Sequence, residues 1–425
     1  MQKRAMTSWA TALVLLASGW LGTSVAHADP IDTTSKTEVA EAYNAQLVPA
    51  LKVKPKWTGS VAKCKNGKPT TQPRAAAGNE SSASTKATFT AVNFYRRLAG
   101  LEPVKENTKL SAKAQQTALI MRANETLSHY PASSWKCYSK HGGATAARSN
   151  IAISWGSSAG AGAHSISLYM DDYGDHNKEV GHRRWILNPE ASRFGTGSTS
   201  RTNALYVYSD AKSDNANPRP KGGTAWPSKG YFPWETVPTS KRWSYSLPLV
   251  FDEDTWNYNY DQFDKAKVTM AKNGKNLKTK VIARGWGAGD PSLVWETPKL
   301  TQPKSGKTDS YKVTITGIKG AKKVSYTVKV FTATYKSLTR TPTPTVSGTA
   351  KVGATLTAKP GTWQPSGVKL TYQWYRGSSK ITGAKAKTYT VTKADKGAQI
   401  KVRVKGSKSG YATVYKHSAH TKKVA

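Results

Sequence analysis

Two side chains capable of acid-base or ligand chemistry, Glu179 and His182, lie three residues apart in the segment EVGHRRWILNP at residues 179–189. On a helical turn this spacing places a carboxylate and an imidazole on the same side, where the carboxylate can orient the imidazole or share a cation with it. Ordinary surface pairs have the same spacing. The spacing alone therefore leaves both interpretations open, and the surrounding elements must supply further site residues.

The region around this pair has helical periodicity. The first predicted helix has Phe89, Val92 and Arg96 on one face and ends at Gly100. Ser111 is the expected N-cap of a second helix. The predicted elements that follow are a helix over residues 111–127, a helix over residues 161–173 and a strand over residues 204–208.

Five ordered segments of residues 84–208 resemble the CAP superfamily, which includes cysteine-rich secretory proteins, insect venom antigens, plant pathogenesis-related proteins and secreted bacterial proteins. They are NFYRRLAGLEPV at 93–104, LSAKAQQTALIMRANETLSH at 110–129, SNIA at 149–152, VGHRRWILNP at 180–189 and GTG at 195–197. The resemblance implies an α-β-α sandwich with a cleft on one side.

The resemblance also implies a set of cleft residues, in which His129 and His182 are the two family histidines. Asp172 falls where many members have a glutamate, whereas Ser149 replaces the glutamate of the family's GENI motif. Two imidazoles and one carboxylate still suffice for a divalent cation such as zinc, with water in the fourth position. Glu179 is a further candidate for the cleft. The remaining histidines are interpreted as solvated: His141, His164, His176, His417 and His420.

The N-terminus predicts export from the cell. Lys3 and Arg4 precede an apolar run at residues 9–21, and Ala26-His27-Ala28 resembles a cleavage site. No later stretch approaches the roughly 20 apolar residues of a transmembrane helix. We therefore expect a secreted protein that is extracellular or loosely associated with a cell wall, and that is a monomer.

Cys64 and Cys137 are the only cysteines of the chain. In an oxidising compartment an isolated pair predicts a disulfide bond. The alternative is two buried or free thiols.

The formal net charge is +39, and the C-terminal part is the most one-sided. From Pro342 onward the sequence contains fourteen Lys and two Arg but only one acidic residue, Asp395. In a strand, Lys401, Arg403 and Lys405 lie on the face opposite to the apolar residues. Such a field attracts polyanions, and outside a cell these are wall polymers, acidic polysaccharides and anionic lipids. No nucleic-acid-binding module is visible, and a merely solubilising surface is the alternative.

Beyond Asp210 the pattern changes to a period of two, which predicts β-structure. Asn273-Gly274 predicts a hairpin turn, and Trp374 is expected to be a core residue. The last module resembles bacterial immunoglobulin-like repeats through GTAKVGATLTAKPGTW at 348–363, YQWYRG at 372–377 and GYATV at 410–414.

We therefore expect a multidomain chain with an α+β domain, the α-β-α sandwich, followed by two all-β sandwich-like domains. The predicted segments are a signal peptide at 1–28, a variable segment at 29–83, a CAP-like domain at 84–210, a β-rich domain at 211–337, a Pro/Thr linker at 338–344 and a basic immunoglobulin-like domain at 345–425.

Three functions fit these residues. The favoured one is a non-enzymatic secreted protein that binds wall polymers, lipids or a cation. The second is a metal-dependent hydrolase that uses the His129/His182 cleft, although without the GENI glutamate it lacks an obvious general base. The third is an adhesion protein in which the CAP-like domain is a scaffold.

Overall fold

The structure is a computed structural model, which describes residues 30–64, 73–155, 159–220, 222–249, 251–252, 257–258, 260–285, 287, 289–304, 306–408 and 410–425. The expected signal peptide at residues 1–28 lies outside these residues. No described helix has both the length and the apolar character needed to cross a membrane.

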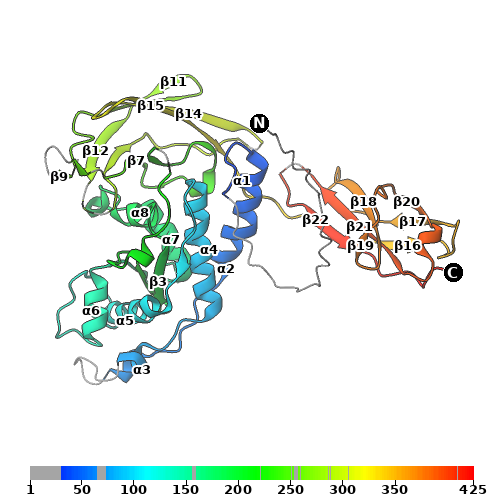
Figure 1. Cartoon of the computed structure of the whole chain (residues 1–425), viewed down its shortest axis with the longest axis horizontal. Coiled ribbons are helices and arrows are strands. Elements are labelled where there is room, and N and C mark those ends of the chain that lie inside the picture. The colour runs from blue at the N-terminus through cyan, green and yellow to red at the C-terminus, as the bar shows by residue number, and fades with distance from the viewer. Residues whose placement is uncertain are drawn as a thin grey trace, which may run out of the picture.

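The first domain is an α-β-α sandwich, as the sequence predicts (Figure 1). Its sheet has the strand order β1 (Lys105–Glu106), β3 (Arg193–Ser198), β4 (Thr202–Tyr206) and β2 (Ser149–Ile153). The helices are α3 (Pro73–Ala77), α4 (Ser82–Leu98), α5 (Thr108–Asn124), α6 (Lys140–Ala146), α7 (Gly162–Asp171) and α8 (Gly181–Ile186).

Capping side chains set where these helices begin. Ser81 caps α4 by accepting a hydrogen bond from the backbone N–H of Ser84, and Gly100 follows its C-terminus at φ +76°. The expected N-cap of α5 was wrong. Asn107, not Ser111, caps this helix, because its side chain accepts from the N–H groups of Lys109 and Leu110.

The sandwich has a separate apolar layer on each face of the sheet. Helices α4 and α7 share one cluster with the sheet residues Phe194 and Leu205, and α5 packs through the other cluster against Ile151 and Ala204. Gly197 permits the second contact, because a Cβ atom there would lie 2.2 Å from the backbone nitrogen of Gln115. The GTG segment therefore lets α5 lie close to the sheet.

The N-terminal segment before α4 forms a nearly continuous helix. It comprises α1 (Lys36–Ala42), a π-helical turn (Tyr43–Leu47) and α2 (Val48–Lys52). This helix lies alongside α4 and reaches the β-rich region with its N-terminal end (Figure 1). Its residue Asn44 donates a 2.7 Å hydrogen bond to the carbonyl of Ala333, so the segment joins both regions.

The β-rich region consists of two larger sheets and a short hairpin. One sheet has the order β11 (Lys275–Leu277), β10 (Lys267–Lys272), β14 (Thr308–Ile318), β15 (Ala321–Phe331) and β6 (Gly230–Pro233), and the other has β12 (Lys280–Gly285), β13 (Ser292–Glu296), β7 (Arg242–Ser246) and β5 (Thr224–Trp226). The hairpin pairs β8 (Phe251–Asp252) with β9 (Asn257–Tyr258). Asn273 and Gly274, both at positive φ, form the predicted turn between β10 and β11.

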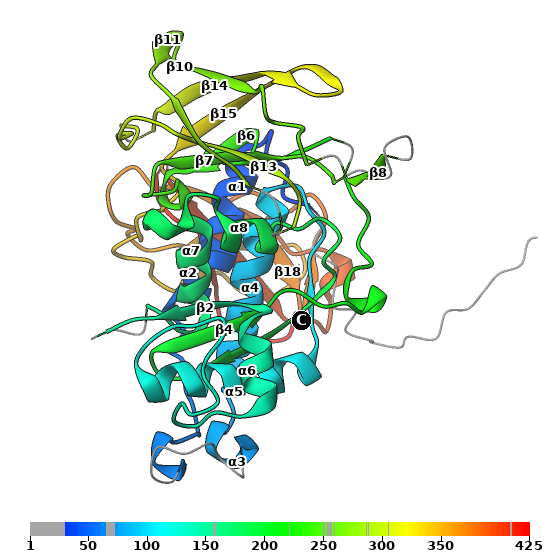
Figure 2. The same cartoon turned by 90° about the vertical axis from the view of Figure 1, so that its left-hand side faces the viewer.

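The core of this β-rich region is continuous with one layer of the sandwich. Trp243, Trp295 and Tyr311 are fully buried, and they belong to the same apolar cluster as Phe94 of α4 and Val39 of α1. The boundary expected near residue 210 is therefore spanned by a shared apolar core, and Figure 2 shows the β-rich region lying against the sandwich.

The C-terminal module has its own core and lies apart from the other two regions (Figure 1). Its sheets are β16 (Thr345–Ser347), β17 (Thr355–Lys359) and β20 (Thr388–Thr390), and β19 (Ser379–Lys380), β18 (Lys369–Arg376), β21 (Ile400–Ser407) and β22 (Val414–His417). Trp374 is fully buried, as predicted. Leu338, within the expected linker, packs against Trp363 and Val404 of this module.

The predicted disulfide bond joins Cys64 and Cys137. It connects the segment before α3 to the loop between α5 and α6, and its sulfurs pack with Leu119 of α5. The two cysteines are 73 residues apart in the sequence.

Replacing both Cys64 and Cys137 by alanine should lower the free energy of unfolding by about 4 kcal/mol, because the bond closes a long loop in the unfolded chain. Thermal unfolding followed by circular dichroism should then show a midpoint about 10 °C lower. An unchanged midpoint would contradict a stabilising role for the bond.

Candidate functional site

A cleft with a volume of about 290 Å³ opens at the edge of the sandwich, where β2, α8 and the loop after α5 meet. His129, His182, Ser149 and Glu179 all line it. Asp172 does not line the cleft, because its side chain is fully buried behind His182. The structure thus brings four of the five expected residues to one surface and places the fifth beneath it.

Asp172 orients His182. The left-handed conformation of Asp172 at the end of α7 turns its carboxylate toward α8. Oδ1 lies 2.7 Å from Nδ1 of His182, and Oδ2 accepts from the backbone N–H of Arg183 at 3.0 Å. A carboxylate at Nδ1 fixes the proton on that nitrogen of the neutral ring, so Nε2 keeps its lone pair for a ligand.

His129 is held in the same way by a backbone carbonyl. Its Nδ1 lies 2.9 Å from the carbonyl oxygen of Ala146, which can only accept a hydrogen bond. Nε2 of the neutral ring is therefore again the unprotonated nitrogen. Ser149 is buried, and its hydroxyl donates to the carbonyl of Thr145 at 2.8 Å rather than to either imidazole. This arrangement does not activate Ser149 as a nucleophile.

Glu179 does not take part in the helical turn that its spacing suggested. Helix α8 begins at Gly181, and Val180 precedes it in a left-handed conformation at φ +49°. Glu179 therefore lies outside the helix and is exposed, although it lines the cleft beside His182.

Several cleft residues were not found from the sequence. The ring of Tyr169 stacks on His182 with a centroid distance of 5.5 Å, and the Asn150 side chain donates to the His182 carbonyl at 2.9 Å. Trp185 and Tyr208 pack together at the cleft wall. His176, interpreted as solvated, is exposed but also lines the cleft. Tyr169 lies within the helix predicted at residues 161–173, but only the fold shows which residues its ring contacts.

Two buried arginines, Arg183 and Arg242, stabilise the backbone beneath this site. Arg183 donates to the carbonyls of Met170, Asp171 and Arg242, and Arg242 of β7 donates to the carbonyl of Asp172 at 2.7 Å. Burial lowers the pKa of Arg183 to about 10, so its side chain stays charged at neutral pH. The β-rich region thus helps to position the Asp172 carboxylate.

The donor set of the cleft does not fit a catalytic zinc ion. Such an ion needs three protein ligands and an open position. Asp172 is already used by His182 and Arg183. Among the described residues, no group of three or more His, Cys, Asp or Glu side chains could hold a metal ion. What the cleft does provide is two hydrogen-bond-accepting imidazole nitrogens beside an aromatic wall.

Comparison with known families agrees with this geometry. Residues 89–209 match the family described as CAP, the cysteine-rich secretory protein family. This region is a CAP domain. The match covers less than a third of the chain, and the N-terminal helix, the β-rich region and the C-terminal module lie outside it.

The solved structures that resemble the chain have low sequence identity and low TM-scores. Domains A168–A170 of titin show 10% identity and a TM-score of 0.20, covering 54% of this chain and 82% of that one. The CD2-binding domain of CD58 shows 10% identity and a TM-score of 0.18, covering 43% and 91%. Tandem Ig repeats of Dlar show 13% identity and a TM-score of 0.13, covering 42% and 86%. These scores carry no argument about function. No curated protein matches the chain.

Replacing Asp172 by asparagine should reverse the tautomer of His182 in the CAP cleft. The amide oxygen can still accept from the N–H of Arg183, which turns the NH₂ group toward Nδ1 and moves the ring proton to Nε2. Long-range ¹H–¹⁵N NMR of the imidazole measures this change. The neighbouring substitution Asp171→Asn removes the same charge and should leave the tautomer as it is. An Nε2 proton already present in the unmodified protein would contradict the assignment.

Proposed function

We propose that this CAP-domain protein is an extracellular binding protein that attaches to anionic wall polymers through its C-terminal module and presents the His129/His182 cleft to a polar ligand. The attachment rests on the basic face of that module. The metal-dependent hydrolase is not favoured, because no three His, Cys, Asp or Glu side chains of the described residues are grouped so that they could hold a metal ion.

The observation that carries the attachment is the burial of the module's single acid. Asp395 is fully buried, where its oxygens accept hydrogen bonds from Arg376, Tyr389 and Thr392. Both oxygens of the Asp395 carboxylate are therefore bonded inside the module. The remaining basic side chains have no carboxylate of the module to neutralise them, so its outer surface is strongly positive.

The cations of β21 are arranged on one face by aromatic rings. Lys401 and Arg403 lie over the ring of Tyr375, at 5.9 Å and 5.6 Å from its centroid. Arg403 and Lys405 lie over the ring of Tyr415, at 4.9 Å and 5.8 Å. Contact with a ring holds a cation in place but does not cancel its charge. This row of positive charge suits an extended polyanion.

His417 lies at the edge of the same face and adds no charge at neutral pH. Its ring packs against Tyr375. Burial, together with the charges of Lys401 and Arg403, lowers the pKa of His417 below its ordinary value. The row of positive charge therefore consists of the two lysines and the arginine.

Reversing the charges of this row should weaken binding to purified anionic wall polymer. We expect Lys401→Glu/Arg403→Glu/Lys405→Glu to raise the dissociation constant of the full mature chain about tenfold, at about 0.5 kcal/mol for each of these partly exposed charges. Retention on immobilised polymer across a salt gradient measures this, and all binding should weaken as salt rises.

The matched control is Lys385→Glu/Lys387→Glu/Lys393→Glu, which changes the net charge equally at exposed positions of the same module. It should have a clearly smaller effect. Equal shifts for the two variants would mean that net charge alone acts. Retention that ignores salt would reject the proposed attachment.

A further inference from the structure

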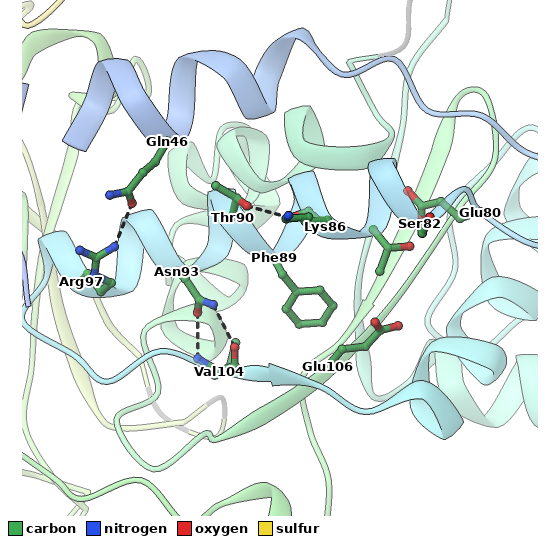
Figure 3. Close-up of a pocket in the computed structure, with 11 residues that line it drawn as sticks. Gln46, Glu80, Ser82, Lys86, Phe89, Thr90, Asn93, Arg97, Val104 and Glu106 are labelled. Carbon is green, nitrogen blue, oxygen red and sulfur yellow. Dashed lines mark hydrogen bonds between the residues drawn. The ribbon is translucent and has the colours of Figure 1, made fainter. Parts of the chain in front are cut away.

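A groove with two lobes lies outside the His129/His182 cleft: the first lobe follows α4 (Figure 3), and the second lies beside α3 and the start of α5. The first lobe has a volume of about 810 Å³ and the second about 690 Å³. Glu80, Thr85 and Glu106 line both lobes, so these residues form the waist between them. A groove with two lobes on either side of a waist accommodates an extended ligand.

The walls of the first lobe come from three segments. Phe89 projects from α4 toward the groove, Gln46 lies on the N-terminal helix and Glu106 on β1 (Figure 3). Asn93 pins the segment before β1 to α4, because its side chain donates to the carbonyl of Val104 at 2.9 Å and accepts from its N–H at 2.8 Å. The Phe89 ring provides a flat apolar surface of the kind on which a sugar ring can pack.

The charges along the groove alternate in sign. The first lobe carries the basic residues Lys86 and Arg97, and the waist carries Glu80 and Glu106. The second lobe is lined by a larger basic set, namely Arg74, Lys109 and Lys113, with His141 beside them. A ligand that fits this pattern has anionic groups in both lobes and neutral hydrogen-bond donors at the waist.

The waist has carboxylate oxygens suited to ligand hydroxyl groups. Oε1 of Glu80 accepts from the hydroxyl of Ser84, and Ser198 also hydrogen-bonds to this largely buried carboxyl group. Burial raises the pKa of Glu80, and the charge of Glu106 adds to that shift. Glu106 is exposed, and its Oε1 accepts from Ser111 at 2.7 Å. The Glu106 carboxylate is therefore the acceptor that a ligand hydroxyl can reach at the waist.

We propose that this groove binds a linear polysaccharide in which acidic sugars alternate with neutral sugars. The basic residues of the two lobes hold the acidic groups, and Glu106 at the waist accepts hydrogen bonds from the hydroxyls of the sugar between them. This site goes beyond the attachment through the C-terminal module, since it recognises the order of groups along the polymer.

Hyaluronan octasaccharide, in which a uronic acid alternates with a neutral N-acetylated sugar, is the probe. Titration calorimetry uses the full mature chain with Lys401→Glu/Arg403→Glu/Lys405→Glu as background, so that the C-terminal face contributes little. Lys86→Glu and Lys113→Glu, one in each lobe, should each weaken binding at least threefold. Lys385→Glu, outside the groove, should not.

Glu106→Gln separates this proposal from simple charge attraction. The amide can still accept from Ser111, but it accepts a sugar hydroxyl less strongly than a carboxylate does, so hyaluronan binding should fall about fivefold. Polygalacturonate, with a carboxylate on every sugar, should instead bind the variant more tightly, because a repulsive charge is gone.

Tighter hyaluronan binding by Glu106→Gln would overturn the proposal in favour of general polyanion attraction. Absence of hyaluronan binding in the background protein would overturn it as well. Neither outcome touches the C-terminal module, which the salt gradient tests separately.

Discussion

Buried guanidinium groups bonded to backbone carbonyls hold the site together. Helix α8 is only six residues long and cannot satisfy its flanking backbone alone. Arg96 of α4 donates to the carbonyls of Ile186 and Asn188 at 2.7 Å and of Ala191 at 3.0 Å, while Arg183 binds carbonyls of α7 and β7. The helix that carries His182 is thus fixed at both ends.

This bonding also explains why the two arginines can be buried. Within the described part of the chain, neither side chain forms a salt bridge with a carboxylate, and several peptide dipoles solvate their charges instead. Burial lowers the pKa of Arg96 to about 9, so it remains charged at neutral pH. Losing either side chain would leave several carbonyls without donors, which costs more than losing one surface contact.

The sequence predicted what depends on local pattern and motif order, and it failed where distant contacts act. The helices, the Asn273-Gly274 turn and the burial of Trp374 follow from local pattern, and the α-β-α sandwich follows from the resemblance to the CAP superfamily. The exact start of α5 did not follow, because Asn107 and Ser111 are both capping residues and only the structure distinguishes them. The carbonyl-binding role of Arg96 also could not be predicted, since its partners lie about 90 residues away.

The N-terminal segment shows the same limit and has a consequence for how the chain folds. Its helix lies in the segment that was expected to be variable. Asn44 binds Ala333 and Lys36 binds Thr308, and these two contacts span 289 and 272 residues of the sequence. A chain made from its N-terminus cannot form these contacts until nearly four-fifths of it has been synthesised. The contacts of the N-terminal helix with the β-rich region therefore form late, whereas its contacts with α4, such as Tyr43 against Phe94, can form early.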